Sequence, residues 1–211
     1  MERKKHLIPA ALFLTIIYTV GRLGLSSAGY SAQFQSLTWL NLVVTAVLTF
    51  AFHQSFTRRF LLTCAGIFSA GFLVEWLGVK TGIFFGEYYY GETLGWKLDD
   101  IPLLIGLNWL VLIYSVANFL KLWRLNMVLY ILAGSAIMVF IDIFLEPFAI
   151  HFGLWLWKNN HIPLQNYAGW FVVSAVMLGF MRNALVQLHV NWLAVFVYFL
   201  QLAFFISFRF Y

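Results

Sequence analysis

Residues 126–149 read NMVLYILAGSAIMVFIDIFLEPFA, an apolar run of membrane-spanning length that contains two carboxyl groups. About 20 apolar residues cross the hydrocarbon core of a bilayer as a helix. Asp142 and Glu146 are spaced i, i+4, so they lie on one face of such a helix, and Pro147 follows directly. Carboxyl groups at membrane depth are costly and indicate a functional site. The run therefore predicts a transmembrane helix that carries chemistry.

The rest of the chain has the same apolar character. Of its 211 residues, 63% are hydrophobic and 10% are charged, whereas soluble domains carry about 25% charged residues. Seven segments approach spanning length, and the second and seventh are the shortest of them. They are residues 7–25, 37–53, 60–78, 101–120, 126–149, 167–186 and 191–208. We therefore expect an all-α polytopic membrane protein, a bundle of about seven transmembrane helices that forms a single domain over residues 1–211.

The lysines and arginines predict the orientation, because cytoplasmic loops are enriched in them. With the N-terminus inside, eight of the 13 fall on the inner side and five on the outer side. The inner set is Arg3, Lys4, Lys5, Arg58, Arg59, Lys121, Arg124 and Arg182, and the outer set is Arg22, Lys80, Lys97, Lys158 and Arg209. We expect an integral protein of the cytoplasmic membrane with its N-terminus inside, and we interpret residues 7–25 as an uncleaved first helix.

Two loops on the predicted outer side are rich in aromatic residues. Residues 81–100, TGIFFGEYYYGETLGWKLDD, combine six aromatic side chains with four glycines and four acids. Glycines permit tight turns and aromatic rings favour partly apolar surroundings, so we expect this loop to fold back over the bundle as a lid. Residues 151–166 contain Trp155 and Trp157. For these two tryptophans, headgroup anchoring and a place in a pocket wall both remain open.

The candidate catalytic residues are Asp142, Glu146 and Glu75. Two carboxyls one helical turn apart in a low dielectric do not both ionise cheaply, so one is expected to keep its proton and serve as an acid. We expect Asp142, one turn deeper, to donate this proton, Glu146 to handle water and Glu75 to assist. The candidate substrate-binding residues are aromatic or amide side chains of similar depth. They are Tyr88, Tyr90, Asn108, Trp109, Trp155, Trp157, Asn166, Tyr167 and Trp170.

Each acid and amide also has a structural interpretation. The Asp142 and Glu146 pair could form hydrogen-bonded contacts between helices, and Asn108 fits an interhelical hydrogen bond as well as a ligand contact. Glu75, near the outer end of its segment, could reach the membrane interface instead of a site. These alternatives stay open at the level of sequence.

Several protein classes are excluded by what the chain lacks. The last segment has no lysine for a retinal Schiff base, the five histidines are scattered, and no glycine-rich phosphate loop occurs. Only one acidic pair lies in an apolar helix, whereas a magnesium-dependent prenyltransferase needs two Asp-rich motifs with basic residues beside them. One cysteine allows no internal disulfide, and basic residues at helix ends do not suggest nucleic acid as a partner. We expect no metal and no cofactor. Acid groups among aromatic faces, each worth about 0.5–2 kcal/mol to a cation, suit protonation of a carbon–carbon double bond.

Three stretches carry a family resemblance, namely residues 81–109, residues 142–157 (DIFLEPFAIHFGLWLW) and residues 163–171 (PLQNYAGWF), together about a quarter of the chain. They resemble the carotenoid biosynthesis family of membrane carotenoid hydratases, of the bisanhydrobacterioruberin hydratase and γ-carotene 1'-hydratase type. The resemblance implies addition of water to a terminal isoprenoid double bond of an acyclic carotenoid, giving a tertiary alcohol without a redox cofactor. It also implies a carotenoid substrate, the lipid bilayer and other carotenoid-pathway enzymes as partners.

Two alternatives use the same features differently. A lycopene-type cyclase would protonate the same bond but quench the cation by ring closure, which a dry pocket favours, whereas the acid-rich outer loop favours hydration. A carotenoid carrier or transporter would bind the pigment without changing it. A transporter should show an inverted repeat with interrupted helices, and no such symmetry is apparent.

Overall fold

The computed structural model describes residues 2–158 and 160–208, without the side chains of residues 2–4. Within this part, the chain forms eight helices and four short strands. The helices are α1 (Glu2–Leu25), α2 (Ser31–Ser36), α3 (Thr38–Ala51), α4 (Arg58–Thr81), α5 (Leu104–Leu120), α6 (Met127–His151), α7 (Leu164–Leu185) and α8 (Trp192–Ile206). The strands are β1 (Tyr88–Tyr90), β2 (Lys97–Leu98), β3 (Ile101–Pro102) and β4 (Trp155–Trp157). The predicted all-α class is confirmed, and each of the seven predicted segments corresponds to one helix.

Four of these helices are long and apolar enough to cross a membrane. They are α1 from Lys5, α4, α6 and α7, with 21, 24, 25 and 22 residues. Helices α3, α5 and α8 are also apolar but have 14, 17 and 15 residues. The chain is therefore a helical membrane protein, as predicted, and a crossing by all seven helices stays a prediction.

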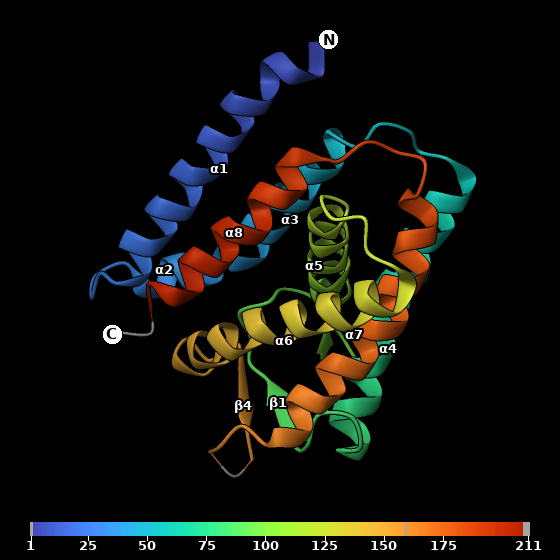
Figure 1. The fold of residues 1–211 in the computed structure, drawn as a ribbon. Coiled ribbons are helices and arrows are strands. Elements are labelled where there is room, and N and C mark those ends of the chain that lie inside the picture. The colour runs from blue at the N-terminus through green and yellow to red at the C-terminus, as the bar shows by residue number, and fades with distance from the viewer. Residues whose placement is uncertain (1, 159, 209–211) are drawn as a thin grey trace.

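Hydrogen bonds join the helix connections at separate ends of the bundle, in which α6 runs at a steep angle to α5 (Figure 1). At one end, the Lys121 ammonium donates a hydrogen bond to the Leu185 carbonyl (2.7 Å), which joins the α5–α6 and α7–α8 connections. At the other end, Arg22 Nε donates to Ser207 Oγ (2.9 Å), which joins the last turns of α1 and α8. The orientation of these two ends relative to the cytoplasm stays a prediction from the lysine and arginine bias. Arg209, one of the residues in that prediction, lies outside the described residues.

Helix α5 lies at the centre, in contact with α3, α4, α6, α7 and α8 (Figure 1). Small residues let its neighbour α4 approach closely, as expected for helix packing in membranes. A Cβ on Gly71 would lie 2.7 Å from the Trp109 side chain, and one on Gly106 would lie 2.5 Å from the Phe68 carbonyl oxygen. This close packing fixes Trp109 against α4.

The two aromatic loops pair with each other, which the sequence did not predict. Strands β1 and β4 are antiparallel, with Tyr88 opposite Trp157 and Tyr90 opposite Trp155. Because side chains alternate along a strand, these four aromatic rings point to one face and are buried, whereas Tyr89 between them is 55% exposed. The small sheet covers one end of the bundle, as Figure 1 shows for β1 and β4. Trp155 and Trp157 are thus part of the interior.

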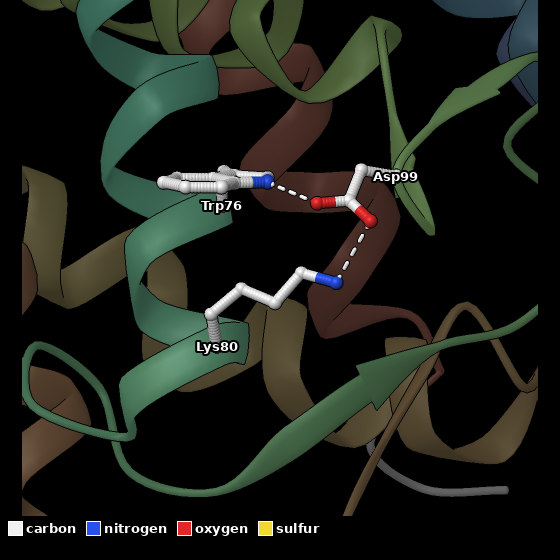
Figure 2. Close-up of polar contacts among 3 residues, drawn as sticks. All are labelled: Trp76, Lys80 and Asp99. Carbon is white, nitrogen blue, oxygen red and sulfur yellow. Dashed lines mark hydrogen bonds and ion pairs between the residues drawn. The ribbon is translucent and has the colours of Figure 1, made fainter.

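A second small sheet joins the lid segment to α4. Strands β2 and β3 form a hairpin whose turn residues Asp99 and Asp100 have positive φ values of 51° and 70°, as two-residue hairpin turns require. The Asp99 carboxylate accepts hydrogen bonds from Trp76 Nε1 (2.6 Å) and Lys80 Nζ (2.9 Å), as Figure 2 shows. These two bonds, first that from Lys80, hold the pKa of Asp99 below its ordinary value. The ion pair fastens the hairpin, and hence the start of α5, onto α4.

Candidate active site

Three buried carboxyl groups come together beneath the β1–β4 sheet. Glu75 comes from α4, and Asp142 and Glu146 come from α6, with exposures of 4%, 0% and 2%. Carboxyl groups are almost never this buried unless hydrogen-bonded or paired. Each therefore needs donors from its surroundings, and the aromatic loops supply most of them.

Glu75 is held by three hydrogen-bond donors. Tyr88 and Tyr90 donate their hydroxyls to Oε2 at 2.5 and 2.7 Å, and Trp109 Nε1 donates to Oε1 at 2.8 Å. The pKa of Tyr88 and of Tyr90 is raised well above the usual value, first by burial and then by the adjacent charge of Glu75. Both phenols thus remain donors at neutral pH. Glu75 is buried and hydrogen-bonded at both carboxyl oxygens, so its side chain does not extend to the surface of the bundle.

Glu146 and Asp142 share one amide. The indoles of Trp157 and Trp155 donate to Glu146 Oε2 at 2.8 and 3.1 Å. Asn166 Nδ2 donates to Asp142 Oδ2 at 2.7 Å and lies 3.4 Å from Glu146 Oε1. The second oxygen of Asp142, Oδ1, is buried without a hydrogen-bond partner among the described residues. The i, i+4 pair is therefore joined into one unit by α7.

A small cavity lies between Glu75 and the Asp142–Glu146 pair. Its volume is about 20 Å³, and a water molecule needs about 10–15 Å³ together with polar partners. Carboxyls of Glu75 and Glu146 and amides of Asn108 and Asn166 contribute to its wall. The rest of the wall is formed by Phe85, Tyr88, Tyr90, Ile105, Trp155, Trp157 and Trp170. The cavity can thus hold a single water molecule beside two carboxyls.

A much larger apolar groove shares a wall with this cavity. Its volume is about 390 Å³, and it lies between α1, α3, α5, α6 and α8. Ile105, Asn108 and Trp155 belong to the walls of both spaces. An apolar molecule in the groove would therefore meet the small cavity at Asn108 and Trp155.

The structure brings most of the predicted substrate-binding residues to this place. Seven of the nine line the small cavity, namely Tyr88, Tyr90, Asn108, Trp155, Trp157, Asn166 and Trp170. Trp109 lies behind them, stacked on Trp170 with ring centroids 4.3 Å apart. Tyr167 and the predicted proton donor Asp142 line neither of these two cavities.

Sequence reasoning missed two residues of the cavity wall and the contribution of α1. Phe85 and Ile105 line the cavity, and α1 lines the groove. Phe84 and Phe85 are equivalent by composition, so nothing in the sequence selects the buried one. Within the described part of the chain, no group of three His, Cys, Asp or Glu side chains is arranged to hold a metal ion.

The fold and this site define a helical membrane protein with a buried acid centre beside an apolar groove. Residues 36–209 match the carotenoid biosynthesis protein family, and the chain belongs to this family. Bisanhydrobacterioruberin hydratase of Haloarcula japonica is 30% identical over 111 residues, which cover 49% of this chain and 38% of that relative. The match thus spans well under half of the relative's length. No solved structure matches the chain.

Proposed function

We propose that the protein is a cofactor-independent carotenoid hydratase. It would add water to a terminal isoprenoid double bond of an acyclic carotenoid and yield a tertiary alcohol. The observation that carries this proposal is the water-sized cavity, lined by two carboxyls, that shares a wall with an apolar groove. Family membership and the related hydratase support a carotenoid-modifying enzyme.

The chemistry needs one group that donates a proton and one group that accepts a proton. The acid transfers a proton to one carbon of the double bond, and the electron pair of the π bond forms the new C–H bond. The other carbon becomes a tertiary cation, water attacks it, and a base removes the extra proton from the oxygen. The net change is addition of one water molecule, with no oxidation or reduction.

Glu146 is the group that we assign to proton donation. It lines the cavity next to Trp155, whereas Asp142 lies off both cavities and reaches Glu146 through Asn166. In this proposal Asp142 does not touch the substrate but acts through Glu146. Two coupled carboxyls retain one proton between them, and Asp142 is the second carboxyl of that pair. This assignment moves the contact with substrate from Asp142, the residue that spacing favoured, to its neighbour one turn away.

Glu75 is the group that we assign to the water molecule. Its carboxyl is oriented by Tyr88, Tyr90 and Trp109, and it lies on the cavity wall. It would orient the water and accept the proton that the attack releases. The rings of Trp155 and Trp157 would stabilise the cation, each by about 0.5–2 kcal/mol.

The test is expression of the protein in cells that accumulate an acyclic carotenoid such as lycopene, followed by mass analysis of the pigments. A mass gain of one water per reacted end group is the expected result. A new ring without a change of mass would identify a cyclase and overturn the proposal. Bound but unaltered pigment would indicate a carrier and would also overturn it.

A further inference from the structure

The apolar groove has the properties of a binding site for a long hydrocarbon chain. Its volume of about 390 Å³ falls in the usual range for ligand sites, and most of its wall is aliphatic or aromatic. Its wall also includes Asn108 and Trp155, which border the acid cavity. A ligand that fills the groove therefore extends to the acid centre.

The groove also reaches the surface of the bundle. Ile16 and Val20 of α1 line it and are 60% and 48% exposed. Leu37, just before α3, and Leu40 on α3 line it on the other side and are 46% and 41% exposed. These exposed apolar side chains border the groove on α1 and α3, so the groove opens sideways between these two helices.

Helix α1 is attached to the bundle mainly along α8. Arg22 bonds Ser207 and lies 4.2 Å from the ring centroid of Phe208, and Tyr18 packs edge-on against Phe204 at 5.3 Å. Only 17% of the apolar window of α1 is buried, against 28–39% for the other three long helices. Figure 1 shows α1 on the outside of the bundle, beside α8. It is the most peripheral wall of the groove.

We propose that this groove holds the polyene chain of the carotenoid and receives it directly from the bilayer between α1 and α3. The inference rests on the proposed function, because it takes the carotenoid as the substrate. A carotenoid is an apolar molecule that stays in the membrane, since each buried CH₂ is worth about 0.8 kcal/mol. Entry from the side avoids moving the chain through water and delivers one end group to Glu146.

Two glycines offer a matched test. Gly21 lines the groove on α1, and Gly66 lies exposed on α4 away from both cavities. An added Cβ meets no atom within 4 Å at either position. The Cβ of a leucine therefore has open space at both sites, but only Gly21→Leu places its side chain in the groove.

The experiment measures pigment per molecule of purified protein and the fraction of pigment converted, in cells that accumulate lycopene. Gly21→Leu is expected to lower bound pigment about tenfold, equivalent to about 1.4 kcal/mol of binding, while Gly66→Leu behaves as wild type. A second pair guards against a folding defect in the first. Val20→Trp narrows the entrance and should reduce both readouts, whereas Leu23→Trp adds the same ring on the exposed face of α1 outside the groove.

The outcomes separate the groove from the chemistry. Wild-type levels of pigment and product in both Gly21→Leu and Val20→Trp would overturn the groove assignment and leave the hydratase proposal standing. Loss of pigment in these variants, together with a wild-type protein that binds but never hydrates, would support the groove and overturn the hydratase. A wild-type protein that retains no pigment would overturn the groove assignment.

Discussion

Two buried polar clusters lie at opposite ends of this bundle, and they differ in chemistry. At the end that carries the β1–β4 sheet, two of the three buried carboxyls line a water-sized cavity, and Asp142 Oδ1 is without a hydrogen-bond partner among the described residues. At the other end, His53, Tyr114, Asn118 and Asn191 are 2%, 0%, 1% and 6% exposed. This second set, the amide cluster, contains no carboxyl group.

The amide cluster is satisfied by its own members and the backbone. His53 Nδ1 lies 2.8 Å from the Tyr114 hydroxyl, and Asn191 Nδ2 donates to that hydroxyl at 3.0 Å and to the Thr49 carbonyl at 2.8 Å. The Asn191 side-chain oxygen caps the first turn of α8 by accepting from Leu193 N and Ala194 N. A fully paired cluster stabilises helix packing, whereas the acid cluster leaves space and polar atoms for a reactant.

The largest expected effect is on the acid cluster. Glu146→Gln keeps the shape and the acceptor for the two indoles but removes the proton, so product formation should fall by at least about 100-fold. The measurement is the hydrated fraction of pigment per folded protein in lycopene-accumulating cells, with bound pigment as evidence of folding. Near-normal product in this variant would move the acid to Glu75.

Its matched control belongs to the amide cluster. Asn191→Ala removes a helix cap and two donor bonds, so unfolding should become easier by about 1–3 kcal/mol. Turnover per folded molecule should not change. A large loss of turnover with normal stability would erase the distinction between the two clusters.

A smaller effect is expected from Asp142→Asn, because Asp142 acts through Glu146. The loss of product should be about tenfold, below that of Glu146→Gln, and the pH dependence of turnover should shift because the pair no longer shares a proton. Pigment analysis across a pH series checks both points. A loss greater than that of Glu146→Gln would restore Asp142 as the direct donor.

The sequence predicted the acid pair because its signal is local. An apolar run with carboxyls at i, i+4 specifies both the helix and the shared face, and Asp142 and Glu146 lie together as expected. The β1–β4 pairing depends on contacts between residues more than 60 positions apart, such as Tyr88 and Trp157, so no local pattern reveals it. The groove is hidden for another reason, because Val20 in a groove and Leu23 in lipid are equally apolar.

The sequence also could not predict which of the two carboxyls lines the cavity. Spacing places Asp142 one turn deeper than Glu146 but does not say which carboxyl faces a space, since that depends on Asn166 from another helix. Asn108 shows the converse, because an amide suited to an interhelical hydrogen bond instead lines both cavities. Helix positions follow from hydropathy, whereas the cavity follows from packing between helices.

A further prediction concerns the lid that covers the acids. Tyr88→Phe removes one of three donors to Glu75, and a bond to a charged group is worth about 1.5–3 kcal/mol, so turnover should fall about tenfold. Tyr89→Phe is the matched control, since Tyr89 lies on the opposite face of β1 and is 55% exposed. Equal turnover in the two variants would mean that the lid has no part in orienting Glu75.

The smallest expected effect lies at the Lys80–Asp99 ion pair, which is exposed to solvent (Figure 2). The pKa of Asp99 is lower in the folded protein than its ordinary value of 3.8, mainly because of the hydrogen bonds from Lys80 and Trp76. The stabilisation of the hairpin is therefore present above that ordinary value and is lost as the pH falls through the lower, folded value. Protection factors for amide hydrogen exchange in residues 96–103, which are corrected for the intrinsic rate at each pH, should be lower at pH 3 than at pH 7. Asp99→Asn keeps an acceptor for Trp76 but cannot titrate, so its protection should be the same at both values. Because Glu92 and Asp100 remain in that variant, the difference between the two proteins isolates Asp99, and an identical pH response would show that another acid controls the hairpin.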